Sequence, residues 1–344
     1  MNEMKPLKIL LSVIDPSGRS KISVEEWIHD KNLFLAVNEL AIKNGLHYKF
    51  ISSLLEKENS FADLNQKKWS EDQENIAKIL ETITLLEKVL QKNHIQYIVI
   101  KIFNTVQHSP NDIDIFVKNS DREKVLSLLE ENGMKSLHSS IAETKMIGQY
   151  AKTDIYTEIS YLGIKFLDKD FLWSSITENT FFGKKYPALN NESDLLMLIP
   201  HYLFGHGRIT LLDFLHLKNR IQNSDIEFCR DYAKREGWLF VFDAMTNLIK
   251  TLDKKIESDD IDFKFPFRFE RIFVTKCISE LPGLNMNRKE KLFLHFSFFL
   301  EDVVYSLENT ILYKIIKSIS PIRNLINSVS AFFKTMRGDR KSSD

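Results

Sequence analysis

Two short apolar runs with strand character, set between long helical patterns, restrict the possible folds of this chain. Residues 95–102 (IQYIVIKI) are rich in β-branched and aromatic side chains, which is typical of a buried strand. A loop containing residues 107–111 (QHSPN) leads into residues 112–117 (DIDIFV), where polar and apolar residues alternate before the run becomes apolar. This predicts a second strand with one exposed end, at which Asp112 and Asp114 point to the same side.

The rest of the chain predicts helices on both sides of a small sheet. Before the strand pair, apolar residues recur at helical spacing in residues 32–43, 48–55 and 76–92, and residues 56–71 read as a loop. After it we expect a helix from Ser120-Asp121 to Asn132-Gly133, and strands near 143–150 and 153–161. Further helices are expected at 193–203, 211–222, 225–235, 238–250 and 292–316, with a loop at 251–264. The expected fold class is α/β (α+β), with a mixed sheet core at 95–172 flanked by helical regions at 1–94 and 173–344.

Composition argues against several functional classes. The 344 residues carry 47 basic and 47 acidic side chains, and a net charge of zero argues against a general nucleic-acid coat. The two cysteines, Cys229 and Cys277, form no CxxC pair, so no zinc site or disulfide framework is indicated and a reducing cytoplasm is expected. The first residues lack a small-residue cleavage site, and no apolar run is long enough to span a bilayer.

The paired carboxylates predict a metal site. Asp112 and Asp114 repel each other at one strand end, and a divalent cation relieves that repulsion. Mg²⁺ prefers a few carboxylates together with phosphate oxygens and water, so Mg²⁺ or Mn²⁺ is the expected cofactor. A third acid commonly comes from a neighbouring strand: Asp154 is the first candidate and Glu158 the second. The alternative is a solvated pair of surface acids.

Four segments resemble one known family. YIVIKIFNTVQHSPNDIDIFV resembles the signature of the uncharacterised nucleotidyltransferase family in the polymerase-β-like superfamily: a strand ending in Lys, a variable loop, then D-I-D and apolar residues. KTDIYTEISYLGIKFLDKDFLW is similar to the segment in which an acid, here Asp154, precedes an aromatic or His position, here Tyr156. ESDLLMLIPHYLFGHGRITLLDFLHL and EEWIHDKNLFLAVNELAIKNGLHYKFISSLL resemble its flanking helical segments, so the resemblance covers residues 20–225.

The resemblance implies a nucleotidyltransferase-like core. The implied reaction is metal-dependent transfer of a nucleoside monophosphate from an NTP to a hydroxyl-type acceptor, with pyrophosphate leaving. Asp112 and Asp114 would bind the metal, and Asp154 would be a third ligand or would help to activate the acceptor. The implied partners are a nucleoside triphosphate and an acceptor that is a small molecule, an RNA end or a protein hydroxyl.

One departure from the family pattern leaves alternatives open. The superfamily usually has a glycine turn after the first strand, whereas here Lys101 matches the family lysine and no glycine follows until Gly133. Either Lys101, Thr105 and Ser109 contact the phosphates instead, or the nucleotide site is degraded and the core is a binding or regulatory module. A DxD glycosyltransferase is the third reading, but it needs repeated βαβ units where residues 4–94 read as helical.

Several other side chains are weaker candidates. Lys101 is equally well explained as a phosphate ligand or as a lysine with a packed stem and a solvated amine, and His108 reads as an exposed loop residue. His201 and His206, five residues apart, should not share one face of an α-helix, although a turn at 205–208 could present His206 and Arg208 to the cleft. Asp213 reads as an acid at a helix N-terminus. From residue 309 the chain carries seven basic and two acidic residues, a net charge of +5, which is typical either of a helix packed on the body with a frayed charged end or of a basic C-terminal tail that makes a peripheral contact.

Overall fold

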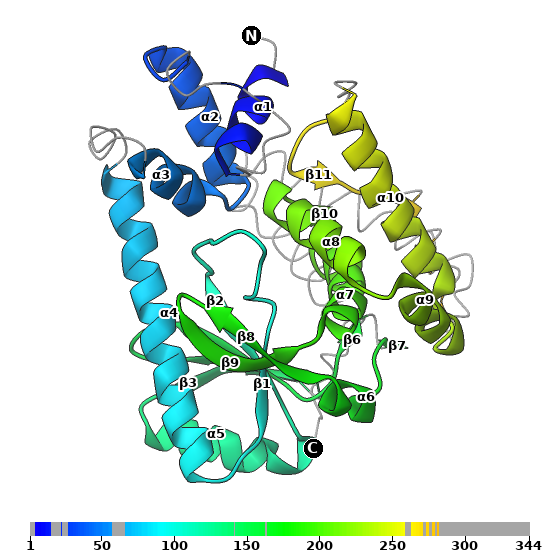
Figure 1. Cartoon of the computed structure of the whole chain (residues 1–344). Coiled ribbons are helices and arrows are strands. Elements are labelled where there is room, and N and C mark those ends of the chain that lie inside the picture. Colours follow the sequence, from blue (N-terminus) through cyan, green and yellow to red (C-terminus); the bar gives the residue numbers. More distant parts are fainter. Residues whose placement is uncertain are drawn as a thin grey trace, which may run out of the picture.

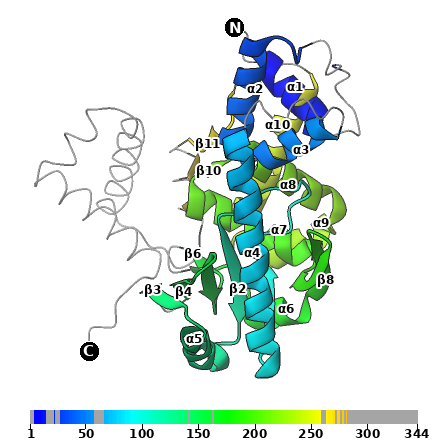
Figure 2. The same cartoon turned by 90° about the vertical axis from the view of Figure 1, so that its left-hand side faces the viewer.

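The computed structural model describes residues 4–14, 22, 27–56, 66–140, 142–161, 164–258, 263–270, 273–274, 277–278 and 281. A mixed sheet lies at the centre, the N-terminal helices lie above it, and the C-terminal helices stack along one side (Figure 1). The long helix α4 (Gln66–Lys92) runs along the sheet from the N-terminal helices to the far end of the molecule (Figure 2). The predicted fold class, a mixed α/β core between helical regions, is confirmed.

The helices and strands follow one another along the chain in three groups. The N-terminal group is α1 (Met4–Ile14), α2 (Lys31–Lys43), α3 (His47–Leu55) and α4. The sheet region comprises β1 (Tyr97–Ile100), β2 (Asp112–Val117), the 3₁₀ turn η3 (Asn119–Asp121), α5 (Arg122–Glu131), β3 (Lys135–Ser139), β4 (Glu143–Ile147), β5 (Lys152–Tyr156), β6 (Ser160–Tyr161), β7 (Ile164–Lys165), α6 (Lys169–Ser174), β8 (Ile176–Phe181) and β9 (Lys184–Leu189). The C-terminal group is α7 (Asn191–Pro200), the π-helical turn η4 (His201–His206), β10 (Arg208–Ile209), α8 (Leu211–Asn223), α9 (Ile226–Arg235), α10 (Leu239–Glu257) and β11 (Phe267–Arg268).

The central sheet has the strand order β1-β2-β5-β4-β3. Only β2 and β5 run parallel; the other neighbours in this sheet are antiparallel. Helix α5 and the β3–β4 hairpin connect β2 to β5, which pairs with β2 in parallel. The register of that parallel pair places Asp114 opposite Asp154.

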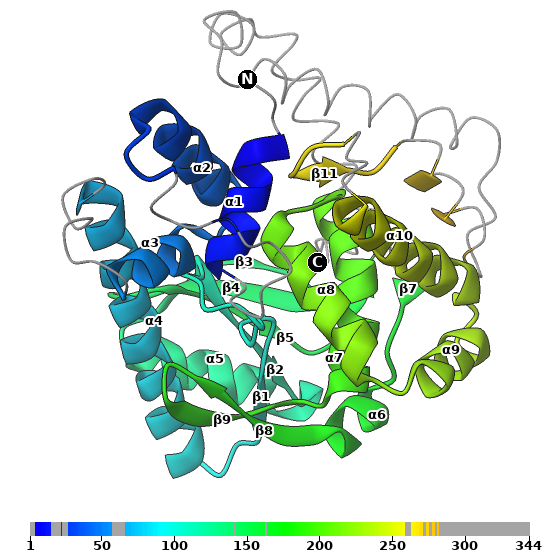
Figure 3. The same ribbon diagram turned by 45° about the horizontal axis from the view of Figure 1, so that its top comes forward.

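The two faces of the sheet pack against different helices. Ile113, Ile115 and Val117 point into a core with α4 and α5, whereas Phe116 points the other way, into the core that holds α7 and α8. The strand alternation therefore assigns Asp112 and Asp114 to the same face as Phe116, toward the C-terminal helices. With the top of the molecule turned forward, α7, α8 and α10 are seen side by side (Figure 3), and α7 and α8 share a core with Phe116.

Most predicted helices are present, and two extend into predicted loops. α4 begins at Gln66, inside the predicted loop at 56–71, because the buried Asp72 in its first turns is held by a hydrogen bond with His47 at 2.7 Å and an ion pair with Lys68 at 2.6 Å. α10 continues to Glu257, through half of the predicted loop at 251–264, since its charged residues there are good helix formers on an exposed face. The predicted helix at 292–316 and the basic tail lie outside the described residues. Within the described part of the chain, no helix has the length and apolar character needed to cross a membrane.

The hairpin β8–β9 lies where the sequence pattern indicated a return to helices. Its turn, Phe182-Gly183, has positive φ at both residues (44° and 80°), as a two-residue type I′ hairpin requires. Phe181, Tyr186 and Ala188 are buried in the same core as α4 and α5. β3 was also not expected from the sequence, because its residues are mostly exposed and polar.

Candidate active site

Three aspartates converge on one face of the sheet. Asp112 and Asp114 share a face of β2, and the parallel register with β5 places Asp154 directly beside Asp114. Asp114 and Asp154 are buried, with 7% and 5% of their surface exposed, and Asp112 at the strand end is half-buried. The structure thus brings together the three acids singled out in the sequence.

Lys101 lies across Asp114. The residue directly follows β1 and has a left-handed φ of 68°, a conformation that a residue other than glycine adopts only at some cost. Its Nζ donates to Asp114 Oδ1 at 2.9 Å and to the Tyr156 hydroxyl at 3.0 Å, and lies 4.1 Å from the Tyr156 ring centroid. Burial alone would lower the pKa of Lys101, but the Asp114 carboxylate raises it to about 12, so the ammonium group keeps its charge. Lys101 is therefore held inside the site by Asp114 and Tyr156 and is not free in solvent.

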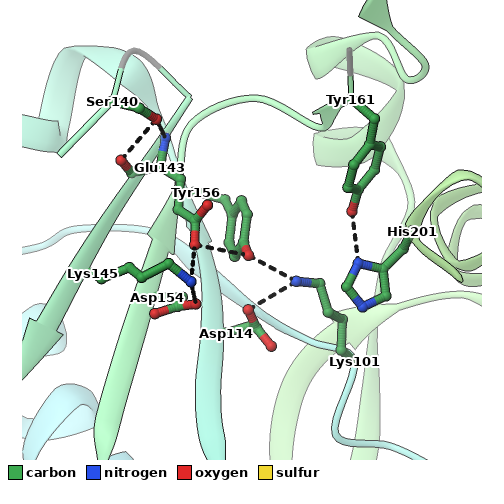
Figure 4. A network of polar contacts seen from close by, with 9 residues as sticks. All are labelled: Lys101, Asp114, Ser140, Glu143, Lys145, Asp154, Tyr156, Tyr161 and His201. Carbon is green, nitrogen blue, oxygen red and sulfur yellow. Dashed lines mark hydrogen bonds and ion pairs between the residues drawn. The ribbon is translucent and has the colours of Figure 1, made fainter. Parts of the chain in front are cut away.

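Strand β4 adds two residues that were not found from the sequence. Its antiparallel register places Lys145 opposite Asp154 and Glu143 opposite Tyr156. Lys145 Nζ contacts Asp154 Oδ2 at 2.8 Å and Glu143 Oε1 at 2.9 Å, and the Tyr156 hydroxyl donates to Glu143 Oε1 at 3.2 Å. A connected network therefore runs from Asp114 through Lys101, Tyr156, Glu143 and Lys145 to Asp154 (Figure 4).

The signal for these two residues was present in the sequence. In ETKMI, Glu143 and Lys145 alternate with Thr144 and Met146, which are fully buried. A polar-apolar alternation of this kind predicts that Glu143 and Lys145 share a face. It does not say which strand lies beside them.

Negative charge dominates the site. Burial raises the pKa of Asp154 to about 7, with the charges of Asp114 and Glu143 adding to the effect in spite of Lys145. The pKa of Asp112 is also raised, first by burial and then by Asp114. Burial would raise the pKa of Glu143 as well, but Lys145 outweighs it and lowers that pKa. A cation that arrived at Asp112 and Asp114 would be stabilised by this excess of negative charge.

A histidine pair on the C-terminal helices faces the network. His201 and His206 have ring centroids 4.4 Å apart, and His201 Nδ1 lies 2.9 Å from the Tyr161 hydroxyl (Figure 4). The expectation that residues five apart do not stack was wrong, because residues 201–206 form a π-helical turn, whose repeat places such residues one above the other. Burial, and then the charge of Lys101, lower the pKa of His201 well below its usual value, so its imidazole is neutral at pH 7.

The loop from Lys101 to Asp112 is held at both ends. Arg220 on α8 donates to the Phe103 carbonyl at 2.9 Å and to Asp194 at 2.7 Å. Asn75 on α4 donates to the Ser109 hydroxyl at 3.0 Å and to the Pro110 carbonyl. These contacts fix the backbone that leads into β2 and so fix the approach to its two aspartates.

The other predicted site residues are spread over this loop and beyond it. Thr105 is exposed, while Ser109 faces α4, where it lines a hollow of about 410 Å³ together with Asn75 and Asn111. His108 is buried, not exposed as expected, because the loop folds it inward within 3.4 Å of Asn104.

Two further acids have structural partners. Glu158 lies beyond the end of β5 and pairs with Lys165 at 2.9 Å, so strand alternation does not bring it to the three aspartates. Asp213 forms a capping box with Thr210 at the start of α8, as its position at a helix N-terminus indicated.

The donor atoms fit a hard divalent cation at Asp112 and Asp114. In the part of the chain that the structure describes, Asp112 has no hydrogen-bond or ion-pair partner, and Lys101 occupies only Oδ1 of Asp114. Among the same residues, no group of three or more His, Cys, Asp or Glu side chains is arranged to hold a metal ion by itself. Two carboxylates are nevertheless what Mg²⁺ commonly takes from a protein when substrate phosphates and water complete its shell.

Comparisons with known proteins give distant likenesses only. No family model matches the sequence, and no curated protein sequence matches it. Among solved structures, the lincosamide antibiotic adenylyltransferase LnuA in its lincomycin-bound form is similar over 42% of this chain and 97% of its own, at 18% identity and a TM-score of 0.32. The antibiotic-resistance factor ANT(2'')-Ia is similar over 55% of this chain and 98% of its own, at 10% identity and a TM-score of 0.31. At these low scores neither likeness assigns a function to this chain.

Proposed function

We propose that the protein is a metal-dependent nucleotidyltransferase that transfers a nucleoside monophosphate from an NTP to a hydroxyl-type acceptor, with pyrophosphate as the leaving group. The observation that supports this most is the convergence of Asp112, Asp114 and Asp154 on neighbouring strands, beside the charged Lys101. Hard oxygen donors and a fixed cation next to one another suit a triphosphate and its metal.

Each residue of the site has a role in this reaction. Asp112 and Asp114 would hold Mg²⁺ or Mn²⁺, which when bound neutralises phosphate charge and orients the triphosphate. Lys101 keeps its charge at neutral pH and offers a contact to the phosphates once they approach Asp114. Asp154, with a pKa of about 7, suits a group that accepts the proton of an attacking hydroxyl near neutral pH. His201 and Tyr161 would form the opposite wall, against which an acceptor packs.

A lapsed enzyme that serves as a binding or regulatory module is the second candidate. Lys101 is bonded to Asp114, and the turn after β1 has no glycine whose backbone could approach a triphosphate. A DxD glycosyltransferase does not fit, since the described residues before β1 form the helices α1 to α4 in place of repeated βαβ units.

A transfer assay distinguishes these candidates. Pyrophosphate release is measured with each NTP, Mg²⁺ or Mn²⁺, and pools of small-molecule hydroxyls, RNA 3′ ends and proteins, and the acceptor is then identified by its added nucleoside monophosphate mass. The matched blank is the Asp112→Asn, Asp114→Asn double variant, which keeps the side-chain shapes and removes the charges. Acceptor-dependent release by the wild type alone supports the transferase. Tight NTP binding without release in any pool favours the binding module.

A further inference from the structure

The aspartates of the site differ in the partners that their carboxylate oxygens already have. Asp112 has no partner among the described residues, and Asp114 keeps one carboxylate oxygen open. Asp154 likewise has one oxygen bonded to a lysine, Lys145 at 2.8 Å, but this ammonium group also contacts Glu143 at 2.9 Å. Lys145 therefore bridges two carboxylates, whereas within the described part of the chain Lys101 contacts only that of Asp114.

The local charge matches one divalent cation. Before a nucleotide binds and with every group ionised, four carboxylates (Asp112, Asp114, Glu143 and Asp154) and two ammonium groups (Lys101 and Lys145) give the site a formal charge of −2. One divalent cation balances that charge, whereas a second would bring two positive charges next to the ammonium group of Lys145. At N···O distances of 2.8 and 2.9 Å, Lys145 bridges Asp154 Oδ2 and Glu143 Oε1, as a cation shared by two carboxylates would do.

On the basis of the proposed function, we infer that this site binds a single divalent cation, at Asp112 and Asp114, and that the Lys145 ammonium group takes the place of a second cation on Asp154. Lys145 is then a positioning residue, which fixes the Asp154 carboxylate and supplies positive charge without a metal. Glu143 holds Lys145 in turn, and the Tyr156 hydroxyl ties Glu143 to Lys101 (Figure 4). A substitution of Lys145 frees Asp154 for a cation and does not open the core, because the lysine side chain is 47% exposed.

The test counts Mn²⁺ per protein chain by equilibrium dialysis, in which free Mn²⁺ and its complex with free nucleotide are equal on both sides and the excess on the protein side is protein-bound. The full-length protein is dialysed against Mn²⁺ and an NTP analogue with a methylene group between the α- and β-phosphates. We expect one Mn²⁺ per wild-type chain and two per Lys145→Met chain. Lys145→Arg, which keeps the charge, should restore a count of one. Lys165→Met is the matched control, since it removes another ion-paired lysine that lies outside the network, and its count should stay at one.

The outcomes separate this inference from the function on which it rests. Two Mn²⁺ in the wild type would overturn the inference and leave the metal-dependent transferase standing. A count of one in both the wild type and a folded Lys145→Met would overturn the role of Lys145. No bound Mn²⁺ in the wild type would remove both the inference and the metal site of the proposed function. If Lys145→Met does not fold, the wild-type count and the milder Lys145→Gln decide in the same way.

Discussion

The ion pair between Lys101 and Asp114 should be a measurable part of the stability of the protein. The two side chains are each 10% exposed and meet at 2.9 Å, so neither charge has enough water around it to stand alone. Lys101→Met keeps the length of the apolar stem and leaves the Asp114 carboxylate without its ammonium partner. Asp114→Asn keeps the shape and leaves the Lys101 charge without a counter-charge.

The size of the effect follows from this burial. Removing one partner of a buried ion pair costs about 3–5 kcal/mol, because the other charge stays in place uncompensated. Lys101→Met also loses the hydrogen bond to Tyr156 and the contact with its ring, so we expect a loss of about 4 kcal/mol in the free energy of unfolding. For Asp114→Asn we expect about 3 kcal/mol, since the amide oxygen still accepts from Lys101. The double variant should lose about 4 kcal/mol, not the sum of the two, which gives a coupling energy of about 3 kcal/mol.

The wild type, the two single variants and the double variant form a double-mutant cycle. Urea denaturation at pH 7 without added metal, followed by circular dichroism, measures the free energy of unfolding of each. The control cycle uses Lys165 and Glu158, whose lysine is 67% exposed, and should give a coupling of at most about 1 kcal/mol. If the losses of Lys101→Met and Asp114→Asn simply add, to within about 0.5 kcal/mol, the two charges do not depend on each other and the reasoning fails.

Two further predictions concern the loop that leads to β2. Arg220→Met should lower the free energy of unfolding by about 3–5 kcal/mol, because it removes a charge partner of the buried Asp194 and the hydrogen bond to the Phe103 carbonyl. A loss under about 1 kcal/mol in urea denaturation would contradict a stabilising role of these two contacts. His108 is buried, and this burial, with the nearby His216, lowers its pKa from 6.5 to about 4. The unfolded chain therefore takes up a proton that the native chain does not, so stability is complete above pH 6.5 and falls toward pH 4 by up to about 1.4 kcal/mol per pH unit. His108→Asn should reduce that slope, and an unchanged slope in urea denaturation at a series of pH values would refute the assignment.

The part of the site on β2 could be predicted from the sequence because its signal is local. Asp112 and Asp114 share a face through the two-residue period of a strand, which needs no knowledge of neighbouring strands. Asp154 was expected on a neighbouring strand because it begins a strand pattern, but its place opposite Asp114 is set by the parallel register of β2 and β5, which the sequence does not show.

The rest of the site depends on contacts between distant segments. The place of Lys145 is set by the register of β4 against β5, and many registers are compatible with the same alternation. The stacking of His201 on His206 requires a π-helical turn, and their spacing alone predicts the opposite in an α-helix. The hairpin β8–β9 was not predicted because β8 is largely exposed and polar. Its contact with the core is made by a few side chains, such as Phe181.

Calorimetric titration of each NTP with Mn²⁺ or Mg²⁺ measures whether the site binds a metal–nucleotide complex, and it is done on the wild type and on the Asp112→Asn, Asp114→Asn double variant. We expect metal-dependent binding of at least one NTP by the wild type and its loss in the double variant, with both proteins folded by circular dichroism. A folded wild type that binds no NTP with either metal, or a double variant that binds as well as the wild type, would contradict it.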